Sequence, residues 1–467
     1  MCGIGAVIHK FKNVNNILYE MMFNLQHRGQ DSSGFVCYDS YNQKMYEARS
    51  FGLVDKNLEN IVNFKGNMGL GHVRYPTQGL ITKNEIQPFT TDSFSGISLV
   101  HNGNITNSPD IYNILYNNGI RCVSTSDSEF MLKLFIFFLT QEIKNTHELT
   151  NKIIGKIIKK LIFVCKGSYS VVIMINNFGL IVFRDIYGIR PLVYSYNKDC
   201  AEISSETIGL TNDKYCNIDN GEVVIFKGGN DIYIYKEKLH DYPLKPCVFE
   251  YIYFARPESY INDILVYEYR EKIAEKIISL IQKSKIDINS IDCIVPIPQT
   301  GLISAICVGQ LLSKPIKNAV IKNRYTYRTF INKDKDSIVK GIKKIKIIKK
   351  LVEGKNILIV DDSIVRGNTS KHIISELKKA NVNKIYMASC CPPIRYPNKY
   401  GIAIPTHNEL IAYNKTEEQV KTELGLNELI YLDLESLCDT LTELNPKIKD
   451  FEVSVFNGKY ISNEQIM

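Results

Sequence analysis

The sequence contains no Cys-x-x-Cys pair, although twelve cysteines are scattered over its 467 residues. Scattered cysteines without such pairs are typical of the reducing cytoplasm, where thiols stay free. The N-terminus also lacks a basic segment followed by an apolar run. The most apolar short stretch, residues 134–139, is far too short to cross a bilayer. We therefore expect a cytoplasmic protein with no membrane partner.

Motifs of nucleic-acid-binding proteins are missing as well. The formal net charge of +8 would suit a nucleic acid. However, zinc-finger, RNP1-like and basic-zipper patterns are absent, and aromatic residues are not interleaved with the basic ones. Many of the 57 lysines and arginines belong to solvated surface. Anionic small molecules are therefore better partners than nucleic acid.

Two patterns of apolar residues divide the chain. With 45% hydrophobic residues it can bury sizeable cores, but 467 residues are too many for one compact domain. The first half shows short β-type runs and helical stretches, the runs at residues 69–73, 97–101, 170–175 and 180–183 and the helices at 127–138 and 152–163. Beyond about residue 240, continuous apolar strands alternate with helices, at 293–297, 357–360 and 385–389.

These patterns predict a two-domain α/β protein. The first domain, residues 2–240, is expected to be layered. The second, residues 241–440, is expected to be a parallel sheet with right-handed crossovers, because its strands read as buried on both faces. Residues 441–467 form a C-terminal tail, and the segment 243–246 marks the boundary.

Cys2 directly follows the initiator methionine. Removal of Met1 would leave a thiol and an α-amino group on one residue. An amine with an ordinary pKa of about 7.7–8.0 can take the thiol proton directly or through water, so no histidine base is needed. The alternative is a cysteine placed there by chance, and a two-residue motif alone does not exclude it.

Further motifs in the first half suit the chemistry of an acyl transfer. Asn102 and Gly103 offer a side-chain amide and a backbone N–H, which together can stabilise an oxyanion. Asp127 opens a helical stretch. As alternatives, Asn-Gly is commonly a hairpin turn, and Ser and Asp commonly cap helices.

The order of these motifs resembles the N-terminal-nucleophile glutamine amidotransferases. The motifs are CGI at residues 2–4, HRGQD at 27–31, HVRYPT at 72–77, HNGN at 101–104 and TSDSE at 125–129. The resemblance implies a four-layer αββα sandwich with Cys2 as nucleophile and Asn102 and Gly103 as the oxyanion hole. It also implies that Arg74 and Asp127 hold the α-carboxylate and α-amino groups of glutamine, with Thr77 as a further contact.

An apolar strand at residues 357–360 runs into two acids and then a turn rich in Gly, Ser and Thr before a helix. Backbone N–H groups and hydroxyls at such a helix start can bind phosphate. Asp361 and Asp362 stand where ribose hydroxyls or hydrated magnesium could be held. The alternative is an ordinary strand-to-helix loop with an Asp cap.

This loop resembles the phosphoribosyl-diphosphate motif of type I phosphoribosyltransferases, in the form found in the amidophosphoribosyltransferase family. Segments 249–259, 294–300, 322–331 and 400–402 agree with that family. The resemblance implies binding of phosphoribosyl diphosphate by Asp361, Asp362, Ser363, Arg366, Gly367, Thr369, Ser370, Thr300, Arg324 and Arg328. It implies Mg²⁺ on Asp361, Asp362 and Gln299.

The implied reaction converts phosphoribosyl diphosphate, glutamine and water to 5-phosphoribosylamine, diphosphate and glutamate. This glycosyl transfer is the first committed step of purine (IMP) biosynthesis. The resemblance also implies a homotetramer and feedback inhibition by purine nucleotides. Two alternatives remain open: another amidotransferase, making glucosamine phosphate or asparagine, and a catalytically silent purine sensor. The acidic loop argues against the first, and Cys2, Arg74, Asn102 and Asp127 argue against the second.

Three departures from the family pattern are visible. Gln299 stands where an acid is common, and Asn368 replaces a usual threonine, so we expect weaker metal or substrate binding and retained activity. Some relatives bind an iron-sulfur cluster through four cysteines. Only Cys247 is kept here, Asn398 stands at the second ligand position, and residues 451–458 lack the final pair. We therefore expect no cluster.

The lysine-rich segment 333–350 allows two interpretations. It is either a solvated charge run with Ile342, Ile345 and Ile348 as a helical stripe on the core, or part of the family's mobile loop. By resemblance, that loop spans residues 322–350 and closes over the bound diphosphate, which would exclude water.

Overall fold

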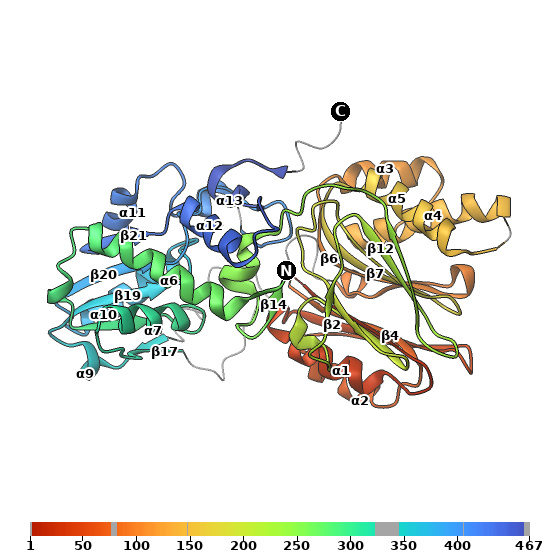
Figure 1. Ribbon diagram of the computed structural model, residues 1–467, viewed down its shortest axis with the longest axis horizontal. Helices are drawn as coiled ribbons and strands as arrows, with labels where there is room; N and C mark the ends of the chain where they lie inside the picture. The colour runs from red at the N-terminus through yellow and green to blue at the C-terminus, as the bar shows by residue number, and fades with distance from the viewer. Residues whose placement is uncertain (1, 76–81, 147, 323–344, 405, 462–467) are drawn as a thin grey trace.

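The computed structural model describes residues 2–75, 82–146, 148–322, 345–404 and 406–461. In Figure 1 the sheets built from the first half of the chain lie to the right, and those built from the second half lie to the left. Within the described ranges, no helix is both long and apolar enough to span a membrane. All twelve cysteines belong to these ranges, and all have free thiols.

Two antiparallel sheets form the centre of the first half. One has the order β11-β9-β10-β1-β4-β2-β3, and the other has the order β13-β12-β8-β7-β6-β5. The strands are β1 Gly3–His9, β2 Ser32–Asp39, β3 Lys44–Phe51, β4 Met68–Arg74, β5 Phe89–Thr91, β6 Ile97–Ile105, β7 Gly167–Ile175, β8 Gly179–Arg184, β9 Val193–Tyr196, β10 Cys200–Ser204, β11 Cys216–Asn217, β12 Glu222–Lys227 and β13 Tyr233–Lys238.

The two sheets pack face to face and carry helices on their outer faces. Alternate residues of β1, such as Ile4, Ala6 and Ile8, fill the core between the sheets. Helices α1 (Asn15–Asn24) and α2 (Leu58–Ile61) cover one outer face, and α3 (Ser108–Asn117), α4 (Asp127–Thr146) and α5 (Asn151–Val164) cover the other (Figure 1). This confirms the expected αββα sandwich.

Gly5 and Gly71 show how closely the first layer of helices packs on its sheet. The Cβ of any other residue at Gly5 would lie 2.5 Å from the Met21 sulfur, and at Gly71 it would lie 2.5 Å from Met22 Cγ. Both methionines belong to α1, so these glycines let α1 lie directly over β1 and β4. This packing fixes the strand that begins just after Cys2.

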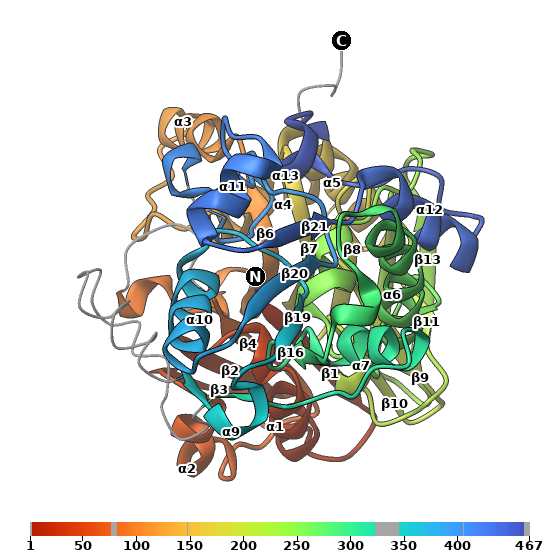
Figure 2. The same ribbon diagram turned by 90° about the vertical axis from the view of Figure 1, so that its left-hand side faces the viewer.

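The second half centres on a parallel four-stranded sheet of order β16-β19-β20-β21. Its strands are β16 Cys293–Pro296, β19 Asn356–Asp361, β20 Lys384–Ser389 and β21 Glu428–Tyr431. The helices are α6 Val266–Lys283, α7 Leu302–Leu311, α9 Lys349–Val352, α10 Asn368–Lys379, α11 Glu417–Leu424, α12 Leu434–Leu444 and α13 Ser454–Asn457. Figure 2 shows the strands of this sheet between α10 on one side and α6 on the other.

Both faces of the parallel sheet are buried, as its apolar strands predict. Ile357 and Ile359 pack on the α10 side, whereas Leu358 and Val360 pack toward α6 and α7. The carboxyl ends of the parallel strands therefore meet at one edge of the sheet. Asp361 is the last residue of β19, and a loop follows it at this edge.

The predicted helical stripe of Ile342, Ile345 and Ile348 is wrong, because Ile345 does not lie in a helix. Residues Ile345–Ile347 form β18, which pairs antiparallel with β17 (Val320–Lys322). Ile342 lies outside the described residues. Ile345 and Ile347 are two residues apart and therefore also suit a short strand, so the spacing of the isoleucines did not determine the element.

The two halves meet through a π-helix and a loop of the second half. The π-helix η6 (Glu250–Phe254) begins shortly after Cys247, which forms a bridge with Glu452. In the loop after β20, the Tyr400 carbonyl accepts a 2.8 Å hydrogen bond from Ser168 Oγ of β7. Remote segments of the chain thus converge near the end of β6.

Candidate functional site

Cys2 is half-buried and lies just before β1, a central strand of the seven-stranded sheet. Its backbone nitrogen donates a 3.1 Å hydrogen bond to Asn102 Oδ1, and its thiol lies 3.9 Å from the Tyr75 carbonyl oxygen. Its own carbonyl accepts a 3.0 Å bond from Arg28 Nε. The nitrogen that would become the α-amine after Met1 removal is therefore held beside the predicted oxyanion residue.

Asn102 and Gly103 lie inside β6 and not in a hairpin turn, so that alternative is wrong. Asn102 is fully buried, and its Nδ2 has no hydrogen-bond partner among the described residues. A buried amide donor without a partner is costly unless a ligand accepts from it. Gly103 has φ of 150°, and a Cβ there would lie 2.0 Å from the Ser168 carbonyl oxygen, so only glycine fits.

Arg74 is the last residue of β4, whose Val73 lies opposite Gly3 in the register with β1. Cys2 and Arg74 therefore lie at the same end of this strand pair. Arg74 is half-buried, and its carbonyl accepts a hydrogen bond from Asp31 N at 3.1 Å. Thr77, predicted as a further glutamine contact, lies outside the described residues.

Asp127 begins α4 but does not serve merely as a helix cap. Its Oδ2 accepts a 3.0 Å bond from Ile105 N at the end of β6, and its Oδ1 lies 3.7 Å from His101 Nδ1. Burial raises the pKa of Asp127, but His101 and the hydrogen bonds outweigh this effect and lower the pKa below its ordinary value. The carboxylate is thus held as an anion against the strand that carries Asn102.

Sequence reasoning missed the side chains that hold this arrangement. Gln87 donates through Nε2 to Ser128 Oγ at 3.0 Å and accepts through Oε1 from His101 N at 2.7 Å. Ser128 Oγ in turn lies 3.0 Å from His101 Nδ1. No sequence pattern signals this link, because Gln87 lies 41 residues before Ser128 along the chain.

The second predicted site lies at the carboxyl end of β19. Asp361 and Asp362 are both 7% exposed, and Asp361 Oδ1 accepts a 2.9 Å bond from Asp362 N. Asp362 accepts hydrogen bonds from Thr300 Oγ1 and, at 2.7 Å, from Ser363 Oγ. Burial, and then the neighbouring Asp362 charge, raise the pKa of Asp361 well above its ordinary value.

The loop after these acids ends at the N-terminus of α10. Gly367 precedes the helix with φ of 74°, and Thr369 and Ser370 lie in its first turn. First-turn N–H groups have no partner within a helix, so this end suits an anion. Arg366 is exposed and forms an ion pair with Glu409 at 2.9 Å. Arg324 and Arg328 lie outside the described residues.

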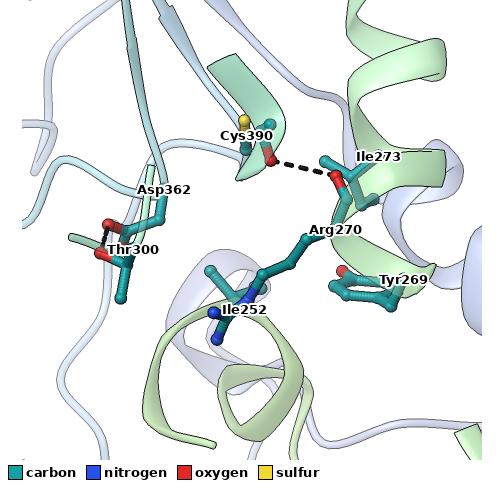
Figure 3. Close-up of a pocket in the computed structure, with 8 residues that line it drawn as sticks. Ile252, Tyr269, Arg270, Ile273, Thr300, Asp362 and Cys390 are labelled. Carbon is teal, nitrogen blue, oxygen red and sulfur yellow. Dashed lines mark hydrogen bonds between the residues drawn. The ribbon is translucent and has the colours of Figure 1, made fainter. Parts of the chain in front are cut away.

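A small cavity is lined in part by Asp362 of the acidic loop (Figure 3). Its lining residues come from η6, α6, the turn before α7, α7 and the ends of β19 and β20: Ile252, Tyr269, Arg270, Ile273, Thr300, Ser304, Asp362 and Cys390. Its wall is mixed, with apolar side chains beside the Thr300–Asp362 hydrogen bond. Burial raises the pKa of Cys390 to about 12, so this thiol stays protonated.

The acidic loop suits a divalent cation. Two adjacent buried carboxylates, one with a strongly raised pKa, are relieved of mutual repulsion by a bound cation, and oxygen ligands are those that Mg²⁺ prefers. Gln299 is exposed in the turn before α7, next to Thr300. Within the described ranges, no group of three or more His, Cys, Asp or Glu side chains is arranged to hold a metal ion.

Cys247 and Asn398 lie where cluster ligands were considered. Cys247 is buried, and burial raises the pKa of its thiol to about 12. Asn398 Oδ1 accepts bonds from Tyr400 N and Ile402 N at 2.8 and 3.0 Å. Asn398 therefore shapes the loop that touches the first half.

Comparison with known proteins extends these observations. A family model described as "Glutamine amidotransferase domain" matches residues 74–212. Amidophosphoribosyltransferases from Pasteurella multocida and Haemophilus influenzae are 37% and 38% identical to this chain, covering 99% of it and 93% of each relative. The glutamine phosphoribosylpyrophosphate amidotransferase of B. subtilis, solved with ADP and GMP, matches with a TM-score of 0.84 at 29% identity, covering 98% of this chain and 97% of that chain.

Fold and sites together define a two-domain glutamine amidotransferase, an αββα sandwich joined to a type I phosphoribosyltransferase domain. Similarity to the relatives runs through both halves of the chain and leaves neither half unmatched. The chain belongs to the amidophosphoribosyltransferase family.

Proposed function

We propose that this protein is a glutamine-dependent amidophosphoribosyltransferase. It converts phosphoribosyl diphosphate, glutamine and water to 5-phosphoribosylamine, diphosphate and glutamate, the first committed step of purine biosynthesis. The observation that carries this proposal is the end-to-end similarity to enzymes of that name, on a chain that presents both a Cys2–Asn102 pair and an acidic phosphate loop.

At the glutamine site, the Cys2 thiolate attacks the side-chain amide of glutamine. The α-amine of processed Cys2 takes the thiol proton and returns it to the leaving ammonia. Asn102 Nδ2 and the Gly103 N–H stabilise the oxyanion, and water then releases glutamate. Arg74 and Asp127 bind the charged ends of glutamine, with Thr77 as a further contact. The unpartnered Asn102 amide supports this assignment.

At the second site, Thr300, Ser363, Thr369 and Ser370 with the start of α10 bind phosphate oxygens, and Asp361 and Asp362 hold the ribose hydroxyls. Arg324, Arg328, Arg366 and Gly367 complete the predicted set. The residues that would hold Mg²⁺ are Asp361, Asp362 and Gln299, and the ion supplies charge neutralisation for the leaving diphosphate. The protein positions the anomeric carbon for ammonia and excludes water.

The chain is proposed to divide into a glutaminase domain at 2–240, a phosphoribosyltransferase domain at 241–440 and a tail at 441–467. Purine nucleotides are proposed as feedback inhibitors, since the B. subtilis relative was solved with ADP and GMP. We also propose a homotetramer, a cytoplasmic location suited to twelve free thiols, and no iron-sulfur cluster. Visible absorption of the purified protein tests the last point.

The test is the rate of glutamate release from glutamine, measured with and without phosphoribosyl diphosphate and Mg²⁺. The proposal predicts strong stimulation by phosphoribosyl diphosphate and the release of diphosphate together with glutamate. Glutaminase activity without stimulation would indicate a different amidotransferase, and nucleotide binding without either activity would indicate a silent sensor.

A further inference from the structure

A cluster of four buried charges lies between the two halves and has no part in the mechanism above. It consists of Arg28, Arg190, Glu206 and Glu250, and we call it the charge cluster. Each of the four residues is at most 2% exposed. Three come from the first half of the chain, whereas Glu250 is the first residue of η6 in the second half.

Glu250 joins the two arginines of the charge cluster. Its Oε1 and Oε2 accept bonds from Arg28 Nη2 at 3.1 and 3.0 Å, and Oε1 also accepts from Arg190 Nη1 at 3.2 Å. Glu206 accepts from Arg28 Nη1 on the other side. Burial lowers the pKa of Arg28, but Glu250 and Glu206 outweigh burial and raise it, so the guanidinium stays charged. Forked contacts of this kind fix orientation as well as distance.

On the glutamine side, the charge cluster bonds to the backbone of Cys2 and to the backbone of the loop after β20. Arg28 Nε donates to the Cys2 carbonyl at 3.0 Å. Arg190 Nε donates to the Tyr400 carbonyl at 2.9 Å. The next residue, Gly401, lies so close to β6 that a Cβ on it would be 2.8 Å from the Gly103 carbonyl oxygen. The cluster therefore positions both the nucleophile and the strand expected to bind the oxyanion.

On the phosphoribosyl side, η6 connects the charge cluster to helix α6. Arg270 of α6 donates through Nε to the Tyr251 carbonyl at 3.0 Å and through Nη2 to the Ala255 carbonyl at 2.9 Å. These bonds tie η6 to α6 near both of its ends. Arg270 and Ile252 then line the cavity that Asp362 also lines (Figure 3). A continuous series of contacts thus joins Cys2 to the acidic loop.

We propose that Glu250 is a positioning residue that keeps the glutamine site in register with the phosphoribosyl site, so that ammonia released at the first reaches the second. This rests on the proposed function. A neutral side chain at position 250 would leave the buried guanidinium groups of Arg28 and Arg190 without the carboxylate they share. The two sites would then be held less firmly relative to each other. Ammonia would then escape to solvent, although each site keeps its own reacting groups.

The test is Glu250→Gln, assayed for glutamate and diphosphate released from the same reaction, and for diphosphate released with ammonium in place of glutamine. The parent should release about one glutamate per diphosphate, as the stoichiometry of the reaction requires. In the variant this ratio should rise roughly three- to tenfold, the size of effect typical of coupling between sites. The ammonium-dependent rate should persist. Glu250→Asp, which keeps the charge, should restore part of the coupling.

Glu142→Gln is the matched control, since Glu142 pairs with Lys156 and Lys160 away from the charge cluster. It should leave the ratio unchanged. An unchanged ratio in Glu250→Gln overturns the inference, and so does an equal fall of both activities, which would mean that Glu250 only stabilises the fold. If Glu250→Gln does not fold, Arg190→Lys, which keeps a charge but loses the fork, should show the same rise. A parent without either activity would refute the proposed function itself.

Discussion

The two polar atoms of the Asn102 side chain have different surroundings. The oxygen accepts from the Cys2 nitrogen, and the buried Nδ2 has no partner in the described part of the chain. In the proposed mechanism, this one side chain both orients Cys2 and offers a donor for the developing charge. A buried donor aimed at the reacting atoms needs no reorganisation when charge develops.

Asn102→Asp tests this double role, because it keeps the shape and removes the donor. Glutamine-dependent turnover should fall about 10²–10³-fold, the usual effect of losing one oxyanion donor. Ammonium-dependent turnover should stay near the parent value in the same assay. Asn118→Asp, on the exposed end of α3, is the control and should alter neither rate. An equal loss of both rates would contradict the assignment.

Residue types and order predicted Cys2, Asn102, Gly103, Arg74 and Asp127 as a set, and the structure brings them around the ends of β1, β4 and β6. Arg28 lies in one of the same motifs, yet its contacts with Cys2 and Glu250 could not be predicted. They span 26 and 222 residues of chain, and only the folded sheets bring these groups together.

At the scale of elements, the loop before α10 depends on Gly367. Gly367→Ala would place a Cβ at φ of 74° and 2.3 Å from Ile411 Cδ1. Gly354→Ala is a matched control, with φ of 70° and no atom within 4 Å. The control should cost about 1–2 kcal/mol of stability through strain alone. Gly367→Ala should cost more.

Gly367→Ala should also raise the KM for phosphoribosyl diphosphate roughly tenfold, because shifted helix-start N–H groups bind phosphate less well. Thermal unfolding and steady-state kinetics on both variants separate the two effects. An unchanged KM for phosphoribosyl diphosphate in Gly367→Ala would count against α10 as the phosphate-binding helix.

The turn before α7 carries the exposed Gln299 where an acid was expected. Gln299→Glu adds a charge beside Asp361 and Asp362, and ligand charge sets affinity for hard cations. The half-saturating Mg²⁺ concentration should fall roughly tenfold in the ammonium-dependent reaction. Gln310→Glu, exposed near the far end of α7, should leave this concentration unchanged. A Mg²⁺ dependence equal to that of the parent would refute a metal role for Gln299.

Helices and strands were predictable from the sequence where the apolar residues follow one clear pattern. The amphipathic α5 and the doubly buried β19 appear where their patterns predict them. The ribbon of β17 and β18 was not predicted, because a three-residue strand is decided by its partner across the sheet and not by its own pattern.

Over the whole molecule, stability at low pH should depend on Glu206. Burial raises its pKa, but His27, Arg28 and the hydrogen bond from Ser259 outweigh burial, so the folded pKa lies below the ordinary 4.5. A lowered carboxyl pKa contributes stability that is present above pH 4.5 and is lost as the pH falls below it.

Glu206→Gln should therefore lower the free energy of unfolding by about 3 kcal/mol at pH 7, since it breaks a buried ion pair. The deficit should shrink as the pH falls below 4.5. Urea unfolding of parent and variant at pH 7 and pH 4 measures the deficit in unfolding free energy and its change with pH. Glu142→Gln, which removes one partner of lysines near the surface, should cost less than about 1 kcal/mol. A deficit that does not depend on pH would contradict the ionised state of Glu206.

The two-domain plan and the chemistry of each site were predictable from motif order, whereas the way the halves join was not. Their junction uses charged side chains that sequence analysis assigns to solvent by default, and a loop fixed by Asn398. Such contacts form only when distant segments of the chain are folded against each other, so the sequence alone does not reveal them.

The most direct test of the central claim follows the nitrogen atom. Protein with Met1 removed is supplied with phosphoribosyl diphosphate, Mg²⁺ and glutamine labelled with ¹⁵N in the side-chain amide, in the presence of excess unlabelled ammonium. If Cys2 releases ammonia that passes directly to the phosphoribosyl site, the phosphoribosylamine formed, trapped and analysed by mass spectrometry, will carry ¹⁵N. Product whose label is diluted to the level of the bulk ammonium would contradict the account.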